Sequence, residues 1–240
     1  SQPRIEQHRD ETREAQWVVG DIARMISRAD TEPGDIAVLF RTHEQPRLFE
    51  TELRKAKIPY ILVGSRSFFD RREVRDILAY LKLINIPGDE ISLRRIINTP
   101  PRGISTRTVD HLLGNATESG TSLWRHLADR ASFDGLPHKA QQACQGFVDM
   151  VKVFRRASRR LGPRALMELV IREIAYKEEV DRYSETAEEK EGRWDTVQEF
   201  INAVALYEQT ASEATLQGFI DEIVLGESES DRDKDQQLKK

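Results

Sequence analysis

The sequence of 240 residues has one cysteine, Cys144, and no long apolar run. A lone cysteine excludes an internal disulfide framework and a zinc site built from several cysteines. A membrane-spanning helix needs about 20 consecutive apolar residues, and no segment approaches that length. No basic segment followed by an apolar one, as in a secretory signal peptide, stands at the start. These absences exclude an integral membrane protein and a disulfide-stabilised domain.

Neither sign of charge dominates, because 37 Lys and Arg stand against 41 Asp and Glu, giving a net charge of −4. A uniformly basic coat for nucleic acid is therefore absent, and any binding to DNA needs a local basic patch. The hydrophobic fraction of 38% is too high for a disordered chain. This length allows one or two domains. Because the chain starts at Ser1 and has a polar stretch at 227–240, we expect a piece of a longer protein.

The sequence also lacks the common catalytic motifs. It contains neither the G-x-x-x-x-G-K-[ST] phosphate loop nor the G-x-S-x-G nucleophile motif. The histidines do not pair at the spacing of metal ligands, so no metal site is predicted. They are His8, His43, His111, His126 and His138. No complete active site is therefore expected within this chain.

The first third reads as α/β. Apolar residues recur at helical spacing in residues 11–29, 45–56 and 71–85, which predicts three amphipathic helices. Continuous apolar runs at 36–40 and 60–63 predict strands of the kind buried in a parallel sheet. Strand, helix, strand, helix is the βαβ pattern with right-handed crossovers. Two strands are too few for a free-standing parallel sheet, so we expect the remaining strands to lie outside the chain.

The remainder reads as helical. We predict helices at 91–98, 105–114, 122–131, after Pro137, at 164–175, at 188–209 and at 216–223. The turn residues Pro87 and Gly88 mark a plausible boundary. The expected domains are therefore an α/β part at 1–88 and a helical domain at 89–226. The charged segment 227–240 is expected to be a linker leading back to the α/β part.

Phe40, Arg41 and Thr42 follow the first predicted strand. In open α/β sheets, ligands bind at the carboxyl ends of strands. An arginine beside an aromatic ring at that place can meet a phosphate and a base. On this signal alone, an ordinary surface arginine remains the favoured interpretation.

Residues 99–105 lie between two short predicted helices and resemble the turn of a helix-hairpin-helix. Gly103 allows the backbone to approach a ligand closely, and free amides at the next helix N-terminus suit a DNA phosphate. The nearby cations that could add charge are Arg94, Arg95, Arg102 and Arg107. A simple inter-helix turn is an equally good interpretation of the spacing.

Five cations gather near the end of the helix that follows Pro137: Lys152, Arg155, Arg156, Arg159 and Arg160. A helix C-terminus carries partial negative charge and favours cations. A solvated face that suits this dipole is therefore the favoured interpretation of the cluster.

Several segments together resemble the UvrD/Rep/PcrA-type superfamily 1 DNA helicases. Residues 36–42 (IAVLFRT) with Gln45 and Arg47 resemble motif IV of that family. Further similar segments, in the family's order, are 11–19, 58–60 (IPY), 68–76 (FFDRREVRD), 79–84 (AYLKLI), 98–105 (NTPPRGIS) and 191–200. The resemblance thus spans most of the chain.

The resemblance implies a specific place in the family's architecture. Such helicases have two RecA-like domains, 1A and 2A, with insertions 1B and 2B. Residues 1–88 would be the first part of the RecA-like domain 2A. Residues 89–226 would be the helical domain 2B, with the helix-hairpin-helix-like element. The Walker A loop and the DExx box would lie in parts of the parent protein outside this sequence.

The resemblance also implies roles for single residues. Arg41 would contact the γ-phosphate of ATP and stabilise charge during phosphoryl transfer. Phe40, which stands where the family usually has tyrosine, would stack on the adenine. The element in contact with duplex DNA would comprise Arg102, Gly103, Ile104, Ser105 and Arg107, with Ser105 replacing the family's second glycine.

The parent protein is thus expected to be a cytoplasmic, ATP-dependent 3′→5′ DNA helicase with a duty in DNA repair or replication restart. Its cofactor would be ATP with Mg²⁺, the metal being bound by parts of the parent outside this sequence. Expected partners are DNA junctions, the remaining helicase domains and accessory repair proteins. By itself the chain should be inactive. Two alternatives remain: a stand-alone helical module for DNA or protein binding, and a nuclease-fused recombination helicase.

Overall fold

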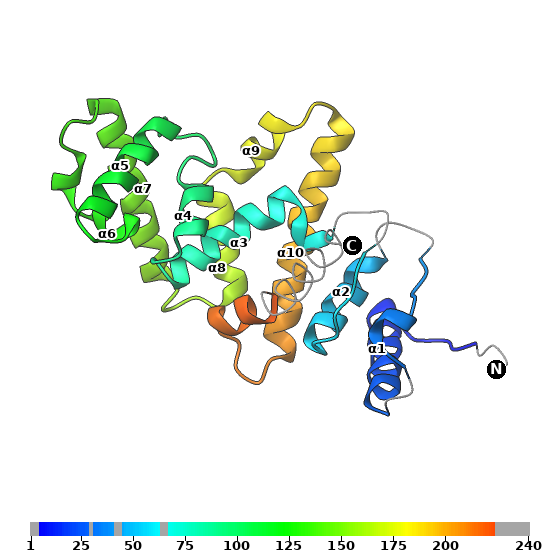
Figure 1. Ribbon diagram of the computed structural model, residues 1–240. Helices are drawn as coiled ribbons and strands as arrows, with labels where there is room; N and C mark the ends of the chain where they lie inside the picture. Colours follow the sequence, from blue (N-terminus) through cyan, green and yellow to red (C-terminus); the bar gives the residue numbers. More distant parts are fainter. Residues whose placement is uncertain (1–4, 29–30, 41–44, 63–66, 224–240) are drawn as a thin grey trace, which may run out of the picture. The chain divides into compact units, whose positions relative to one another are not determined.

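The computed structural model describes residues 5–28, 31–40, 45–62 and 67–223. The chain divides into two compact units. The first unit comprises Ser1–Phe68 with Asp221–Lys240, and the second unit comprises Phe69–Ile220. Each unit is described by itself, with the element labels of Figure 1.

Two helices organise the first unit. Helix α1 (Glu11–Ser27) begins after Asp10, whose carboxylate accepts a hydrogen bond from the Arg13 amide at 2.8 Å. A short 3₁₀ turn, η1 (Pro33–Asp35), precedes the extended residues, and α2 (Pro46–Lys55) starts on its proline. The core of this unit is a cluster of Val19, Ile22 and Leu53.

The two predicted strands are not formed among the described residues, to which no strand is assigned. Residues 36–40 and 58–62 instead alternate between half-buried and exposed positions. On the covered side, residues such as Val38 and Tyr60 pack against the cluster of α1 and α2, whereas Leu39 is 91% and Ile61 53% exposed. A strand is stabilised by hydrogen bonds to neighbouring strands, and a sheet needs about three strands to be stable. The side chains of these two segments alternate as they do in strands, but no hydrogen-bond ladder to a neighbouring strand is formed among the described residues.

The second unit is helical, as the sequence predicts. Its elements, with the short turn that leads into it, are η2 (Phe68–Asp70), α3 (Arg72–Asn85), α4 (Glu90–Ile96), α5 (Thr106–Glu118), α6 (Leu123–Ala128), η3 (Arg130–Phe133), α7 (His138–Ala157), α8 (Pro163–Glu173), α9 (Tyr176–Tyr183) and α10 (Ala187–Thr210). Residues 216–223 are also helical. Helix α9 was not predicted. It follows Ala175, whose φ of 50° is left-handed, and it buries only Tyr176, Glu179 and Val180.

Helix α3 is the centre of the second unit. Ten of its fourteen residues are buried, and Val74, Ile77, Tyr80 and Leu81 are wholly inaccessible to solvent. It packs against α4, α7, α8 and α10 (Figure 1). Because α3 packs within the helical unit, the boundary between the compact units lies between Phe68 and Phe69. The sequence suggests a functional boundary further along the chain, after Gly88. That functional boundary stays a prediction.

Candidate nucleic-acid interface

The turn between α4 and α5 has the backbone that the sequence suggests. Gly103 has a φ of +83°, a conformation that residues with a Cβ rarely adopt. Ser105 is the N-cap of α5, and its hydroxyl accepts a hydrogen bond from the Thr108 amide at 3.2 Å. Because a cap satisfies only part of the four free amides of a helix start, amides of the first turn remain available to an anion.

Asn98 holds this turn together. Its side-chain oxygen accepts hydrogen bonds from the backbone amides of Arg102, at 2.8 Å, and Ile104, at 3.2 Å. Ile104 is 1% exposed, so its side chain anchors the turn in the core and is not available to a ligand. Gly103, Ser105 and Arg107 are exposed. No role for Asn98 was predicted, although a short amide side chain ahead of a turn is a known sequence signal for such bonds.

Arg102 is half-buried, and its side chain contacts the protein. Its Nη1 donates to the carbonyls of Ile96, at 2.9 Å, and Pro100, at 3.0 Å, and its Nη2 donates to the Tyr80 hydroxyl. The guanidinium also lies 5.6 Å from the centre of the Phe147 ring. Arg102 thus fastens the turn to α3 and α7. A direct contact between this guanidinium and DNA stays a prediction.

Tyr80 of α3 completes the support of the turn. Its hydroxyl donates to the carbonyl of Thr99 at 2.6 Å while it accepts from Arg102. Burial raises the pKa of Tyr80 to about 12, although the neighbouring Arg102 opposes the shift. The phenol is therefore neutral at physiological pH and able to donate its proton to Thr99.

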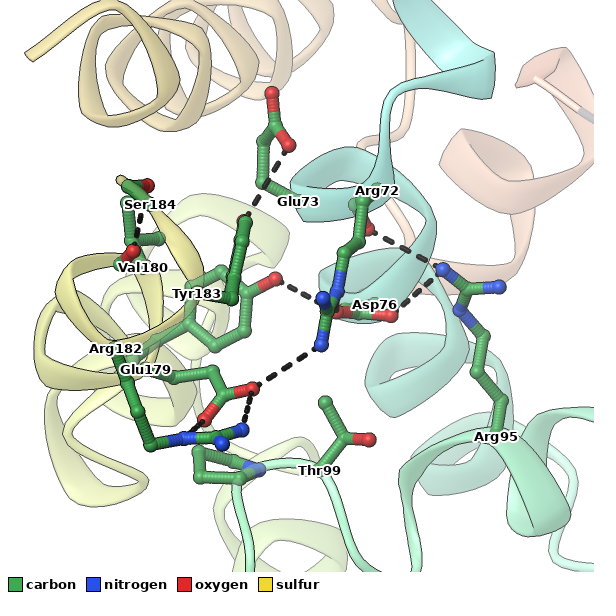
Figure 2. Close-up of polar contacts among 12 residues, drawn as sticks. Arg72, Glu73, Asp76, Arg95, Thr99, Glu179, Val180, Arg182, Tyr183 and Ser184 are labelled. Atoms are coloured by element: carbon green, nitrogen blue, oxygen red, sulfur yellow. Dashed lines mark hydrogen bonds and ion pairs between the residues drawn. The ribbon is translucent and has the colours of Figure 1, made fainter. Parts of the chain in front are cut away.

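Three buried carboxylates, Glu73, Asp76 and Glu179, connect α3 to α4, α9 and α10. Figure 2 shows their contacts with α4 and α9. Asp76 is 2% exposed and lies between two arginines, 2.7 Å from Nη2 of Arg95 and 3.6 Å from Nε of Arg72. It also accepts a hydrogen bond from the Tyr176 hydroxyl at 2.9 Å. The bond to Arg95 fixes α4, and hence the start of the turn, on α3.

The other two carboxylates hold α9 and α10. Glu179 accepts two hydrogen bonds from Arg182, at 2.8 and 2.9 Å, and one from Arg72 at 3.3 Å. These contacts are visible in Figure 2. The Arg72 guanidinium lies 3.9 Å from the centre of the Tyr183 ring, a cation–π contact. The three carboxylates, together with Arg72, Arg95, Arg182 and Arg193, are called the ionic cluster below. We interpret this cluster as the group that holds the turn between α4 and α5 in position.

Glu73 is the third carboxylate of the ionic cluster. It accepts from the Tyr183 hydroxyl at 3.5 Å and lies 3.9 Å from Nη1 of Arg193. Burial, and to a lesser degree the negative charge of Glu73, raise the pKa of Tyr183 to about 12. Burial likewise raises the pKa of Tyr176, next to Asp76. Both phenols are therefore neutral donors to the carboxylates at physiological pH.

The residues predicted to bind the nucleotide lie in the first unit. Phe40 is half-buried, with its ring centre 5.1 Å from that of Phe49. Arg41 lies outside the described residues. The pairing of Phe40 and Arg41 at a nucleotide stays a prediction.

The first unit also contains a buried carboxylate that the sequence analysis missed. Glu50 accepts hydrogen bonds from the hydroxyls of Ser67, at 2.6 Å, and Tyr60, at 3.3 Å. Burial raises the pKa of Glu50, against the opposing effects of Ser67 and Arg54. Arg54 donates to the Tyr60 hydroxyl at 2.9 Å and to the carbonyl of Ile223 at 2.8 Å. We interpret this group as a structural link of α2 to Tyr60 and Ser67.

No group of three or more His, Cys, Asp and Glu side chains among the described residues is arranged to hold a metal ion. No helix within them is both long enough and apolar enough to cross a membrane.

Replacing Arg102 by alanine is expected to lower the free energy of unfolding by about 2 kcal/mol, because two carbonyls and the Tyr80 hydroxyl lose a charged donor. Chemical denaturation measures this loss. Duplex binding should weaken as well, since the turn loses its support. The salt slope is the slope of the logarithm of the binding constant against the logarithm of the salt concentration. A simultaneous fall of about one in its magnitude would indicate that the guanidinium itself contacts a phosphate. Unchanged stability would contradict the supporting role.

Comparison with known proteins identifies relatives of the chain. Residues 1–239 match the family model described as UvrD-like helicase C-terminal domain. The chain is 32% identical, over 88% of its length, to the ATP-dependent DNA helicase PcrA of Bacillus subtilis, and equally similar to that of Staphylococcus epidermidis. The identity to the Staphylococcus aureus protein is 31%. The chain spans only 28–29% of these relatives. The matches favour the helicase interpretation over a stand-alone module.

Proposed function

Since the chain belongs to the UvrD-like helicase C-terminal domain family, we propose that it is part of an ATP-dependent DNA helicase that moves 3′→5′. The observation that carries the proposal is the turn between α4 and α5, in a chain with this family membership. The turn combines Gly103 at positive φ, a capped helix start and the exposed Arg107. This is a suitable arrangement for a phosphate of duplex DNA.

We propose that residues 1–88 form the first part of a RecA-like domain 2A. The half-covered segments 36–40 and 58–62 support this, because Leu39 and Ile61 expose apolar surface that a completed sheet would bury. In this arrangement, Phe40 stacks on adenine and Arg41 contacts the γ-phosphate of ATP. The Mg²⁺ that accompanies ATP is bound by other parts of the helicase.

Residues 89–226 then form the duplex-facing domain 2B, which regulates unwinding, and 227–240 lead back to 2A. The proposed partners are a junction of single-stranded and duplex DNA, the remaining helicase domains and accessory repair proteins. The proposed location is the cytoplasm.

The test is duplex binding by the 240-residue chain, measured by fluorescence anisotropy at several salt concentrations. We expect binding whose salt slope falls by about one in Arg107→Gln, because one phosphate contact is lost. The control is Arg172→Gln, which changes the same charge on the exposed surface of α8. The chain alone should hydrolyse no ATP, with or without DNA. Absence of duplex binding, or DNA-stimulated ATP turnover by the chain alone, would contradict the proposal.

A further inference from the structure

The end of α7 and the residues that directly follow it carry a second positively charged surface, apart from the turn between α4 and α5. It consists of Lys152, Arg156, Arg159 and Arg160, all exposed, and is called the basic face below. Phe147, which contacts Arg102, lies on the same helix nine residues before Arg156, about 13 Å along the axis. The basic face and the turn therefore belong to the same helical unit but occupy different places on it.

The cations of the basic face have no acidic partner in the part of the chain that the structure describes. No side-chain hydrogen bond or ion pair joins any of the four to a described residue. Arg155, by contrast, donates from Nε to the carbonyl of Ile84 at 3.2 Å and so serves the end of α3. With respect to the described residues, the basic face is thus free to meet an external anion.

A hollow of about 450 Å³ accompanies these cations. It is lined by Asp149, Lys152, Val153, Arg155, Arg156 and Arg159. The carboxylate of Asp149 accepts a hydrogen bond from the Gln145 side chain at 2.9 Å, which engages the single acidic group of this lining. Four cations against one carboxylate give the hollow a positive potential.

The helix dipole does not explain this concentration of charge. At an exposed site the dipole stabilises a cation by a small amount and only within the last turn of the helix. Lys152 and Arg156 stand four residues apart on α7, where like charges repel each other to a similar extent. An anionic ligand from outside the chain would offset this repulsion. Because several cations lie close together, the ligand that fits them carries closely spaced negative charges.

We propose that the basic face is a second contact for the phosphate backbone of duplex DNA. The inference rests on the proposed function, which makes DNA the ligand of the chain. Duplex DNA carries about one negative charge per 1.7 Å of its axis, so a basic surface one or two helical turns long meets several phosphates. Such contacts orient the duplex without reading its sequence.

The experiment compares two double variants of the 240-residue chain in the same duplex titration. Arg156→Gln with Arg159→Gln removes two cations of the basic face. Lys139→Gln with Arg172→Gln is the matched control, because it removes two exposed cations from the start of α7 and from α8. Glutamine keeps a high helix propensity, and circular dichroism melting checks that both variants fold.

In the first variant, the salt slope should fall by about two and the affinity by on the order of tenfold or more at 0.1 M salt. In the control variant, neither the salt slope nor the affinity should change by a comparable amount. Equal behaviour of the two double variants would overturn the inference, even where Arg107→Gln still weakens binding and so supports the proposed function. Absence of duplex binding by the unaltered chain would overturn both.

Discussion

Replacing Asp76 by alanine is expected to lower the free energy of unfolding by about 3–5 kcal/mol. The carboxylate is 2% exposed and is the shared partner of Arg72, Arg95 and the Tyr176 hydroxyl. Its removal takes an ion-pair partner from both arginines and an acceptor from the buried Tyr176 hydroxyl, although Arg72 keeps its bond to Glu179 and Arg95 its bond to the carbonyl of Arg72. Denaturation in guanidinium chloride, followed by far-UV circular dichroism, measures the change.

The control for Asp76 is Asp149→Ala. Asp149 is exposed and contacts Gln145, so the expected loss is within about 0.5 kcal/mol. Asp76→Asn separates charge from hydrogen bonding, because the amide oxygen can still accept from Tyr176. We expect the free energy of unfolding of Asp76→Asn to lie between that of Asp76→Ala and that of the unaltered chain. A loss below about 1 kcal/mol in Asp76→Ala would mean that the ionic cluster adds little to the stability of the second unit.

The effect should extend to the turn. Arg95 joins α4 to Asp76, and α4 leads directly into the segment that contains Asn98 and Arg102. Loss of the carboxylate therefore removes one polar attachment of α4 to α3, whereas the contacts of Tyr80 with Arg102 and with the carbonyl of Thr99 remain. Duplex binding by Asp76→Ala is expected to weaken even though Asp76 itself is buried.

Apart from α9, the described helices could be predicted from the sequence because their signals are local. Apolar residues at helical spacing predicted α3 to within one residue, and Pro163 marked the start of α8. Gly103 likewise predicted a special backbone at the turn. Among the described residues neither predicted strand forms, because a strand depends on neighbours that are distant in sequence or outside the chain, whereas the apolar runs at 36–40 and 60–63 are local.

The ionic cluster could not be predicted for a related reason. Asp76, Arg95, Glu179 and Arg193 lie on four different helices and are brought together only by packing. In the sequence each is an ordinary charged residue on a helix face. The inward direction of Arg102 was unpredictable in the same way, because it depends on Tyr80 and Phe147. Residue type and spacing indicated the turn but not which of its side chains face the protein.

In a helicase that contains this chain, Arg41→Ala is expected to reduce ATP turnover by at least about a thousandfold, with DNA binding retained. An arginine that stabilises the charge of the transferring phosphoryl group contributes rate factors of that size. The resemblance to motif IV gives Arg41 this role, and Phe40 beside it the role of stacking on the base. Steady-state turnover with saturating single-stranded DNA measures the effect, and fluorescence anisotropy measures DNA binding.

Two further variants make the test of Arg41 specific. Arg28→Ala removes an exposed arginine at the end of α1 and should leave turnover unchanged. Arg41→Lys keeps the charge but loses the planar, two-pronged donor, so we expect it to recover only part of the rate. Unchanged turnover in Arg41→Ala would remove Arg41 from the nucleotide site. It would leave the duplex interface of the second unit standing, because Arg107 and the basic face are tested without ATP.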